Sequence, residues 1–208
     1  MNVDHIHWLG HATFRIQDGD LQIYIDPWKL PAHAPQADVV LVTHGHFDHY
    51  CEEDIARIEK RATVFVAPPD VAAKLKGRKV VTAEPGGSYN VGQLRVEATP
   101  AYNLNKDFHK RKEGWVGYVV TLSTGQRVYH SGDTDAIPEM DDVEADVALM
   151  PCGGTYTMAA AEMAAAANRF KPSVLIPMHW GDIVGQKADA ETVAGAFKGR
   201  TVIKEVER

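Results

Sequence analysis

Long hydrophobic runs, cysteines and clustered positive charge are all scarce in this chain of 208 residues. No apolar run approaches the ~20 residues of a membrane-spanning helix, so we expect no membrane partner. Two cysteines, Cys51 and Cys152, do not make a disulfide framework and favour a cytoplasmic, reducing compartment. The N-terminus has no basic region followed by an apolar core, and we therefore expect no signal peptide.

The charge balance bears on possible partners. With 22 basic and 28 acidic residues the net charge is -6, which argues against a large nucleic-acid footprint. One basic group interrupts the even scatter of positive charge, and it could attract an anionic substrate, although a solvated loop is the simpler interpretation: Lys106, Lys110, Arg111 and Lys112. The partner we expect is a small molecule, and the sequence leaves the oligomeric state open.

The densest chemistry lies in Thr43–His49, which reads Thr-His-Gly-His-Phe-Asp-His. Three imidazoles and a carboxylate within six residues are costly to bury without a shared partner, and a divalent cation is the simplest one. In an extended segment His44 and His46 face the same way and can hold one ion. Asp48 and His49 then point to a second position beside it. This stretch predicts a metal site rather than a chance group of surface histidines.

Apolar runs and turn signals predict alternating strands and helices. Residues 38–43 are nearly continuously apolar, which is typical of a strand buried on both faces. Further strands are expected at 6–10, 13–16, 21–26, 63–67, 79–82, 94–99, 115–122, 126–130, 146–150, 173–178 and 201–204, and helices at 52–60, 68–76, 158–170 and 188–197. This order fits an α/β fold of two mixed sheets packed together with helices outside, in a single domain over residues 1–208.

Further polar clusters follow predicted strands, where open α/β sheets place their sites. They are Gly10-His11, Asp26, the run from His130 to Asp135, and the run from Met178 to Asp182. Each alone is weak evidence, because a histidine or aspartate at a strand end is often a cap or turn residue. Together with Thr43–His49 they indicate one composite site.

These motifs resemble the metallo-β-lactamase superfamily of hydrolases. The resemblance rests on Thr43–His49, on Ser-Gly-Asp-Thr at 131–134 and on Pro-Met-His at 177–179. The opening Trp-Leu-Gly-His-Ala-Thr at 8–13 and Ile-Asp-Pro at 25–27 are similar to the branch that contains ascorbate-phosphate lactonases. The resemblance implies an αββα sandwich with a two-metal site at one edge. The ligands it implies are His44 and His46 for the first metal, Asp48, His49 and His179 for the second, and Asp133 bridging both.

One position departs from the superfamily's pattern, because no histidine follows the strand that ends near Thr99. His109, in the long loop 100–114, is the nearest imidazole and could reach back to the first metal. The alternative is that His109 is a solvated loop residue. Asn103 and Tyr102 are weaker candidates for that metal, and we assign Asn103 to the substrate pocket.

Several residues are predicted to support the site. Asp26 is expected to orient a ligand histidine, since a ligating imidazole needs an acceptor on its other nitrogen. His11 and His130 are expected beside the ligands, with plain turn or core positions as the alternative. Tyr156 and Trp180 are candidate pocket walls.

The favoured function is metal-dependent hydrolysis of an ester, lactone or phosphoester bond in a small substrate that could be anionic. Two divalent ions, zinc first and manganese or iron next, would supply a metal-bound hydroxide. Asp48 would hold the hydroxide, and Tyr102 or His109 would meet the leaving group. The rival interpretations are a nuclease or phosphodiesterase of the same superfamily, an iron-dependent oxidoreductase, and a non-catalytic metal-binding protein.

Overall fold

Two β-sheets form the centre of the computed structural model, which describes all 208 residues. The six strands of the first sheet, in spatial order, are β1 (Ile6–Trp8), β2 (Phe14–Asp18), β3 (Leu21–Ile25), β4 (Val39–Leu41), β5 (Val64–Ala67) and β6 (Lys79–Thr82). The seven strands of the second sheet are β13 (Arg200–Thr201), β12 (Val174–Met178), β11 (Val147–Pro151), β10 (Arg127–His130), β9 (Val116–Thr121), β8 (Leu94–Pro100) and β7 (Ser88–Val91).

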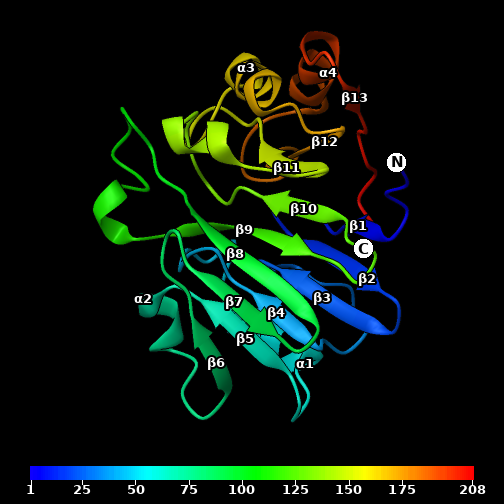
Figure 1. Cartoon of the computed structure of the whole chain (residues 1–208), viewed down its shortest axis with the longest axis vertical. Coiled ribbons are helices and arrows are strands. Elements are labelled where there is room, and N and C mark those ends of the chain that lie inside the picture. The colour runs from blue at the N-terminus through cyan, green and yellow to red at the C-terminus, as the bar shows by residue number, and fades with distance from the viewer.

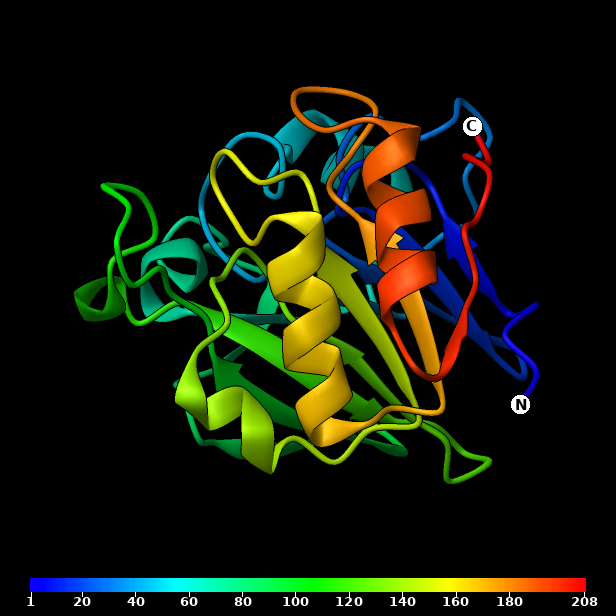
Figure 2. The ribbon, with the colours of Figure 1, turned by 90° about the horizontal axis from the view of Figure 1, so that it is seen from above.

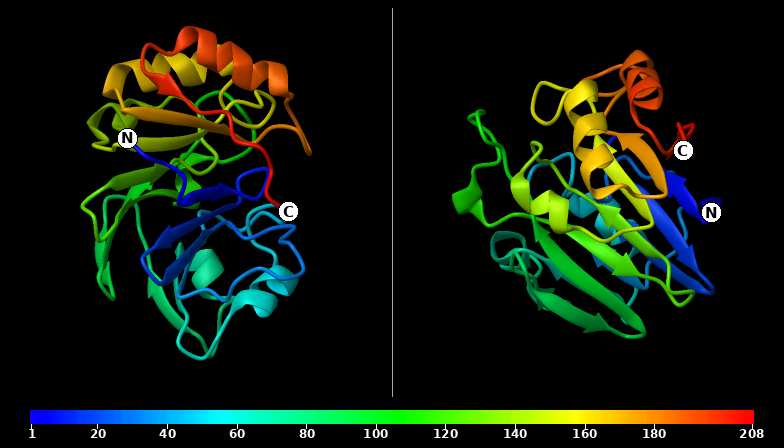
Figure 3. Two further views of the ribbon diagram at one scale, coloured as in Figure 1. Left: turned by 90° about the vertical axis from the view of Figure 1, so that its right-hand side faces the viewer. Right: turned by 45° about the horizontal axis from the view of Figure 1, so that its top comes forward.

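Helices cover the outer face of each sheet. The α-helices are α1 (Glu52–Ile58), α2 (Pro69–Ala72), α3 (Ala160–Phe170) and α4 (Lys187–Ala196), and two 3-10 helices are η1 (Arg111–Glu113) and η2 (Pro138–Asp142). Figure 1 shows α3 and α4 at the top, above the second sheet, and α1 and α2 in the lower half of the molecule beside the first sheet. In Figure 2 α3 and α4 lie side by side across their sheet, and Figure 3 shows the layers from the side. The αββα sandwich expected from the sequence is confirmed.

Alternation along the strands of the first sheet explains these layers. In β3, Ile23 and Ile25 point into the large core between the sheets, whereas Tyr24 points to the smaller core under the helices. In the same way Leu41 of β4 faces the other sheet and Val40 faces the helices. Burying each such aliphatic side chain stabilises the fold by roughly 1.5–3 kcal/mol. A strand buried on both faces therefore reads as a continuous apolar run, as predicted for β4.

The parallel strands decide where a site can form. Strands β3 to β6 pair in parallel, and so do β10 to β13. The loops that follow parallel neighbours leave the sheet at one edge, so the polar segments after β3 and β4 are brought together, as are those after β10, β11 and β12.

Some element boundaries differ from the sequence prediction. The edge strand β7 was not predicted, because Ser-Tyr-Asn-Val is only four residues long and has only Val91 buried. Strand β13 is two residues long rather than four, and α2 ends at Ala72 rather than Lys76. The loop after β8 contains η1 and projects at the left of Figure 1. None of the helices has the length and hydrophobicity needed to cross a lipid bilayer.

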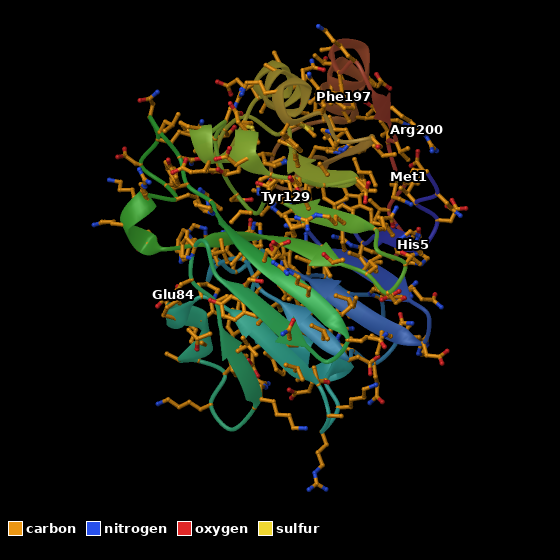
Figure 4. All side chains as sticks on the ribbon, viewed as in Figure 1. Met1, His5, Glu84, Tyr129, Phe197 and Arg200 are labelled. Carbon is orange, nitrogen blue, oxygen red and sulfur yellow. The ribbon has the colours of Figure 1, made fainter.

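The two ends of the chain lie close together. Arg200 donates a hydrogen bond to the carbonyl of Met1 at 2.7 Å, and Figure 4 shows the two residues on the same side of the molecule. Further along the tail, the backbone N–H of Glu207 donates to the carbonyl of Trp8, and Arg208 donates to the carbonyl of Leu9. The C-terminal segment thus holds the strand that leads into His11.

A glycine in β9 gives a test of the packing between neighbouring segments. A Cβ atom at Gly117 would lie 2.7 Å from the carbonyl oxygens of His130 and Ser131, so we expect Gly117→Ala to lower the free energy of unfolding by about 1–3 kcal/mol. At Gly195, in α4, a Cβ atom would have no neighbouring atom within 4 Å. We therefore expect Gly195→Ala to raise the free energy of unfolding by about 0.5–1 kcal/mol. Urea unfolding measures both, and equal effects would contradict this packing.

Candidate metal centre

The predicted site residues gather at one edge of the sandwich because each follows a strand of one or the other sheet. His11 comes after β1, Asp26 after β3 and Thr43–His49 after β4. The second sheet contributes His109 from the loop after β8, Asp133 after β10 and His179 after β12, so that the full set is His11, Asp26, His44, His46, Asp48, His49, His109, Asp133 and His179.

Asp26 is a fully buried carboxylate that accepts three hydrogen bonds. The donors are the backbone N–H and the hydroxyl of Thr43 and Nδ1 of His49, each at 2.7 Å. Since Nδ1 of His49 donates to a carboxylate, Nε2 is the nitrogen left to face the site. Asp26 therefore orients His49 as the sequence predicted.

His44 is oriented through the same carboxylate. The Thr43 hydroxyl gives its proton to Asp26, so it can only accept from Nδ1 of His44, which lies 3.0 Å away. Nε2 of His44 is then turned towards Nδ1 of His46, also 3.0 Å away. Two ring nitrogens thus converge on one point.

His109 completes this first group of imidazoles. Its Nε2 lies 3.2 Å from Nδ1 of His46, and the ligand atoms of His44, His46 and His109 all lie within 4.8 Å of one another. The loop is held in this position by Asn103, whose N–H donates to the carbonyl of His109 at 2.7 Å and whose amide contacts Nδ1 at 3.2 Å. His109 is 4% exposed, which excludes the alternative of a solvated loop residue.

A second group consists of His11, Asp48, His49 and His179, whose ligand atoms also lie within 4.8 Å of one another. His11 Nε2 is 3.0 Å from Asp48 Oδ2, and the rings of His11 and His179 are 3.8 Å apart. Asp133 lies between the two groups. Its oxygens are 3.1 Å from His179 Nε2, 3.3 Å from His109 Nε2 and 3.4 Å from His49 Nε2.

The donor set fits divalent cations. Buried ring nitrogens and a carboxylate oxygen face one another without hydrogen bonds, and these orphaned atoms include Nε2 of His49, both ring nitrogens of His179 and Oδ1 of Asp133. Unpaired buried polar atoms are costly, and imidazole and carboxylate are ligands that zinc, manganese and iron accept. Because Asp133 lies beside members of both groups, one shared carboxylate could contact two ions.

Electrostatics prepares most of these imidazoles for coordination. Burial lowers the pKa of His11 and of His109 to about 4, and burial also holds the pKa of His44 well below its usual value. His49 differs: burial lowers its pKa, but the charges of Asp133 and Asp26 outweigh burial and hold the pKa well above its usual value. A cation must therefore displace a proton from His49.

The backbone at the site is strained. The six non-glycine residues with positive φ include His11 (50°), Asp26 (49°), His109 (54°) and His179 (59°). Left-handed backbone costs most residues roughly 1–2 kcal/mol, and histidine and aspartate are among the types found there most often. Such strain concentrates at functional sites, where the surrounding structure enforces it.

Three predicted residues are not brought to the cluster. Tyr102 donates its hydroxyl to Glu139 at 2.9 Å, and Trp180 donates to the carbonyl of Pro177 while its ring lies on Trp8. His130 uses both ring nitrogens on the backbone, with Nε2 donating to Ala12 and Nδ1 accepting from Gly132. For Tyr102 and His130, a hydrogen bond takes the polar atom that was expected to face the leaving group or a ligand, whereas the ring of Trp180, predicted as a pocket wall, packs on Trp8 and does not line the pocket.

Other residues at the site were missed. Trp115 lies against three of the imidazoles, with ring centroids 4.8 Å from His44, 4.9 Å from His46 and 5.6 Å from His109. Phe47, Phe108 and Ile183 line the pocket above the cluster together with the predicted Tyr156. No periodic signal marks single apolar residues on loops, although their position beside ligand motifs could have suggested a wall.

Comparisons with known proteins agree with this geometry. A model of the β-lactamase superfamily domain matches residues 5–179. The chain belongs to the β-lactamase superfamily. It is 32% identical to a metal-dependent hydrolase of Thermoplasma acidophilum over 98% of this chain and 96% of the relative.

Solved structures show the same relationship. A protein from Parabacteroides distasonis is 31% identical, with a TM-score of 0.86 and coverage of 97% of this chain and 93% of that one. A metallo hydrolase of the archaeon Ignicoccus hospitalis is 25% identical, with a TM-score of 0.80 and coverage of 98% and 95%. The chain is therefore a metal-dependent hydrolase of the metallo-β-lactamase fold, as the motifs predicted.

The raised pKa of His49 makes metal binding by this hydrolase pH-dependent. Because an ion held by His49 competes with the His49 proton, affinity at that position should fall as pH falls, and binding there should release a proton. Titration calorimetry of the metal-free hydrolase with Zn²⁺ at pH 6, in buffers of different ionisation enthalpy, measures this release. Binding heats that do not depend on the buffer would contradict the assignment of His49 as a metal ligand that loses a proton on binding.

The position of His109 gives a second test on the hydrolase. We expect His109→Asn, which keeps left-handed backbone accessible, to weaken one metal equivalent at least about 10-fold and to leave the other bound. Elemental analysis after dialysis against graded chelator separates the two equivalents. His33→Asn is the matched control, since His33 is exposed and lies outside both groups. Equal metal retention in both variants would remove His109 from the ligand set.

Proposed function

We propose that this hydrolase binds two divalent cations, with zinc favoured and manganese or iron as alternatives. His44, His46 and His109 would hold one, Asp48, His49 and His179 the other, and Asp133 would contact both. When bound, the pair supplies hydroxide at neutral pH and stabilises negative charge on a substrate oxygen. The observation that carries this proposal is the position of Asp133 beside members of both groups, together with the buried, unpaired ring nitrogens of His49 and His179.

Asp48 is placed to orient the attacking water. Its side chain lines the pocket, and Oδ2 accepts a hydrogen bond from Nε2 of His11 at 3.0 Å. Burial raises the pKa of Asp48, but the hydrogen bond from His11 and the charge of His49 outweigh it and lower the pKa to about 2. Asp48 is therefore ionised at neutral pH, and it can accept a hydrogen bond from water and take up its proton as the bond to the substrate forms. His11 fixes the carboxylate in that direction.

Tyr102 and His109 do not serve the leaving group in this proposal. The Tyr102 hydroxyl is held by Glu139, and His109 faces His46 and Asp133 from within the ligand group. The leaving group would instead depart towards the open side of the pocket, where water can protonate it.

The substrate is proposed to be a small molecule with an ester, lactone or phosphoester bond. The pocket encloses about 360 Å³, and its wall contains no lysine or arginine. A protein that binds nucleic acid needs lysine and arginine side chains to contact the phosphate backbone. The pocket wall has none of these side chains, and the net charge of the chain is -6. We further propose that the 208 residues act as one domain, because both sheets share one core.

The experiment is a panel of 4-nitrophenyl esters, lactones, thioesters and phosphodiesters, assayed on protein loaded with Zn²⁺, Mn²⁺ or Fe²⁺. Turnover of at least one ester, lactone or phosphodiester that chelator abolishes and metal restores is the expected result. No turnover with any metal would overturn the proposed bond class.

Removing one proposed ligand from each group should remove both metal and turnover. We expect His44→Ala/Asp48→Ala to lose bound metal and more than about 100-fold in turnover, since loss of even an outer partner of a ligand costs about 10- to 100-fold. The strands of the core contain neither residue, so circular dichroism should change little. His33→Ala/Asp107→Ala removes the same residue types from exposed positions and should behave as wild type. Metal content near the wild-type level in the first variant would contradict the assignment.

A further inference from the structure

The pocket above the metal centre has two chemically different parts. Its floor consists of His46, Asp48, His109, Asp133 and His179. Its remaining wall is apolar, and we call it the apolar rim: Phe47, Phe108, Tyr156 and Ile183. The four rim residues come from four separate loops, which follow β4, β8, β11 and β12.

The apolar rim concentrates exposed hydrophobic surface at one place. Phe47 is 68% exposed, Phe108 50% and Ile183 39%, and these three are half of the large hydrophobic side chains that the molecule exposes. Single exposed apolar residues are normal, but a group around a pocket marks a binding surface. The free energy lost by exposing such side chains is regained when an apolar ligand covers them.

Three of the four rim residues pack against another aromatic ring. The rings of Phe108 and Tyr156 meet edge to face at 5.1 Å, and Phe47 meets Trp28 in the same way at 5.9 Å. Asn103 joins the two loops behind the first pair, because its side-chain amide donates to the carbonyl of Phe108 at 3.1 Å and of Tyr156 at 2.7 Å. Asn103, predicted as a pocket residue, thus positions the pocket wall.

Three of the four basic side chains of the loop 100–114 pair with carboxylates away from the pocket. Lys106 pairs with Asp135, Arg111 with Glu139 at 2.9 Å, and Lys110 with Asp107 at 3.5 Å. None of these cations lines the pocket, where Asp48 and Asp133 are the charged side chains besides the histidines. A negative group away from the bond that reacts would find no counter-charge there.

We propose that the apolar rim binds an uncharged apolar portion of the substrate, an alkyl or aryl group attached next to the bond that is cleaved. The size agrees, because a cavity of about 150 Å³ holds benzene and this pocket encloses about 360 Å³. Phe47 and Phe108 then determine specificity. This inference rests on the proposed hydrolysis, and it replaces the anionic substrate that the basic loop residues had suggested.

The first test compares neutral esters of increasing length, namely 4-nitrophenyl acetate, butyrate and hexanoate, with the anionic 4-nitrophenyl hemiglutarate. With metal-loaded protein, kcat/KM should rise by up to about fourfold per methylene, which corresponds to ~0.8 kcal/mol, and the anionic ester should be the poorest of similar length. Phe47→Ala/Phe108→Ala should flatten this dependence. Leu104→Ala is the control: Leu104 is 53% exposed on the same loop as Phe108 but does not line the pocket, so the dependence should persist.

A binding measurement separates this inference from the proposed reaction. The neutral fluorescent probe N-phenyl-1-naphthylamine should bind the metal-loaded protein and should lose about 10-fold or more in affinity in Phe47→Ala/Phe108→Ala, but not in Leu104→Ala. Turnover that is independent of chain length, or higher for the anionic ester, overturns the inference and leaves the hydrolysis intact. Rim-dependent probe binding without turnover of any panel substrate supports the inference and overturns the proposed reaction. Equal probe binding by both variants overturns the inference by itself.

Discussion

One buried carboxylate sets the geometry on which the metal centre depends. Asp26 is 0% exposed, and an isolated charge at that depth would be very unfavourable without donors. Thr43 and His49 supply those donors, and the Thr43 hydroxyl passes the constraint on to His44. Asp26 thereby fixes which nitrogen faces the site in one imidazole of each proposed ligand group. Replacing Asp26 would leave the Thr43–His49 motif unchanged in the sequence, but the rings of His44 and His49 would lose the contacts that orient them.

The layered fold turns separate motifs into one site. Each sheet presents its loops at an edge, and the core between the sheets brings those two edges into contact. Polar floor and apolar wall then arise from the same loops: Thr43–His49 contributes four polar residues to the centre and Phe47 to the rim. Within this one short loop, the histidines and Asp48 would serve the chemistry, whereas Phe47 would serve the proposed substrate specificity.

Much of this arrangement could be predicted from the sequence. Continuous apolar runs predicted the buried strands, and dense clusters of histidine and aspartate at strand ends pointed to Thr43–His49, Asp133 and His179, which the structure brings together at one edge. The contribution of His109 could only be guessed, because the course of a long loop is set by tertiary contacts such as those of Asn103 rather than by residue spacing. Tyr102 and Trp180 were placed incorrectly for a similar reason. The Tyr102 hydroxyl finds a partner in Glu139 and the Trp180 ring packs on Trp8, and composition gives no sign of such contacts.

The division of the ligands between the two sheets has a consequence for how the molecule forms. The proposed ligands His44, His46, Asp48 and His49 precede all strands of the second sheet, whereas His109, Asp133 and His179 follow strands of that sheet. An ion shared between these sets would close a chain segment that runs through most of the molecule, and such closure removes much of the freedom of an unfolded chain. Because the N-terminal half alone lacks the proposed shared ligand Asp133, we expect high-affinity uptake only once the sheets have docked. Metal uptake during refolding would then report on docking of the halves, a step that secondary structure alone does not reveal.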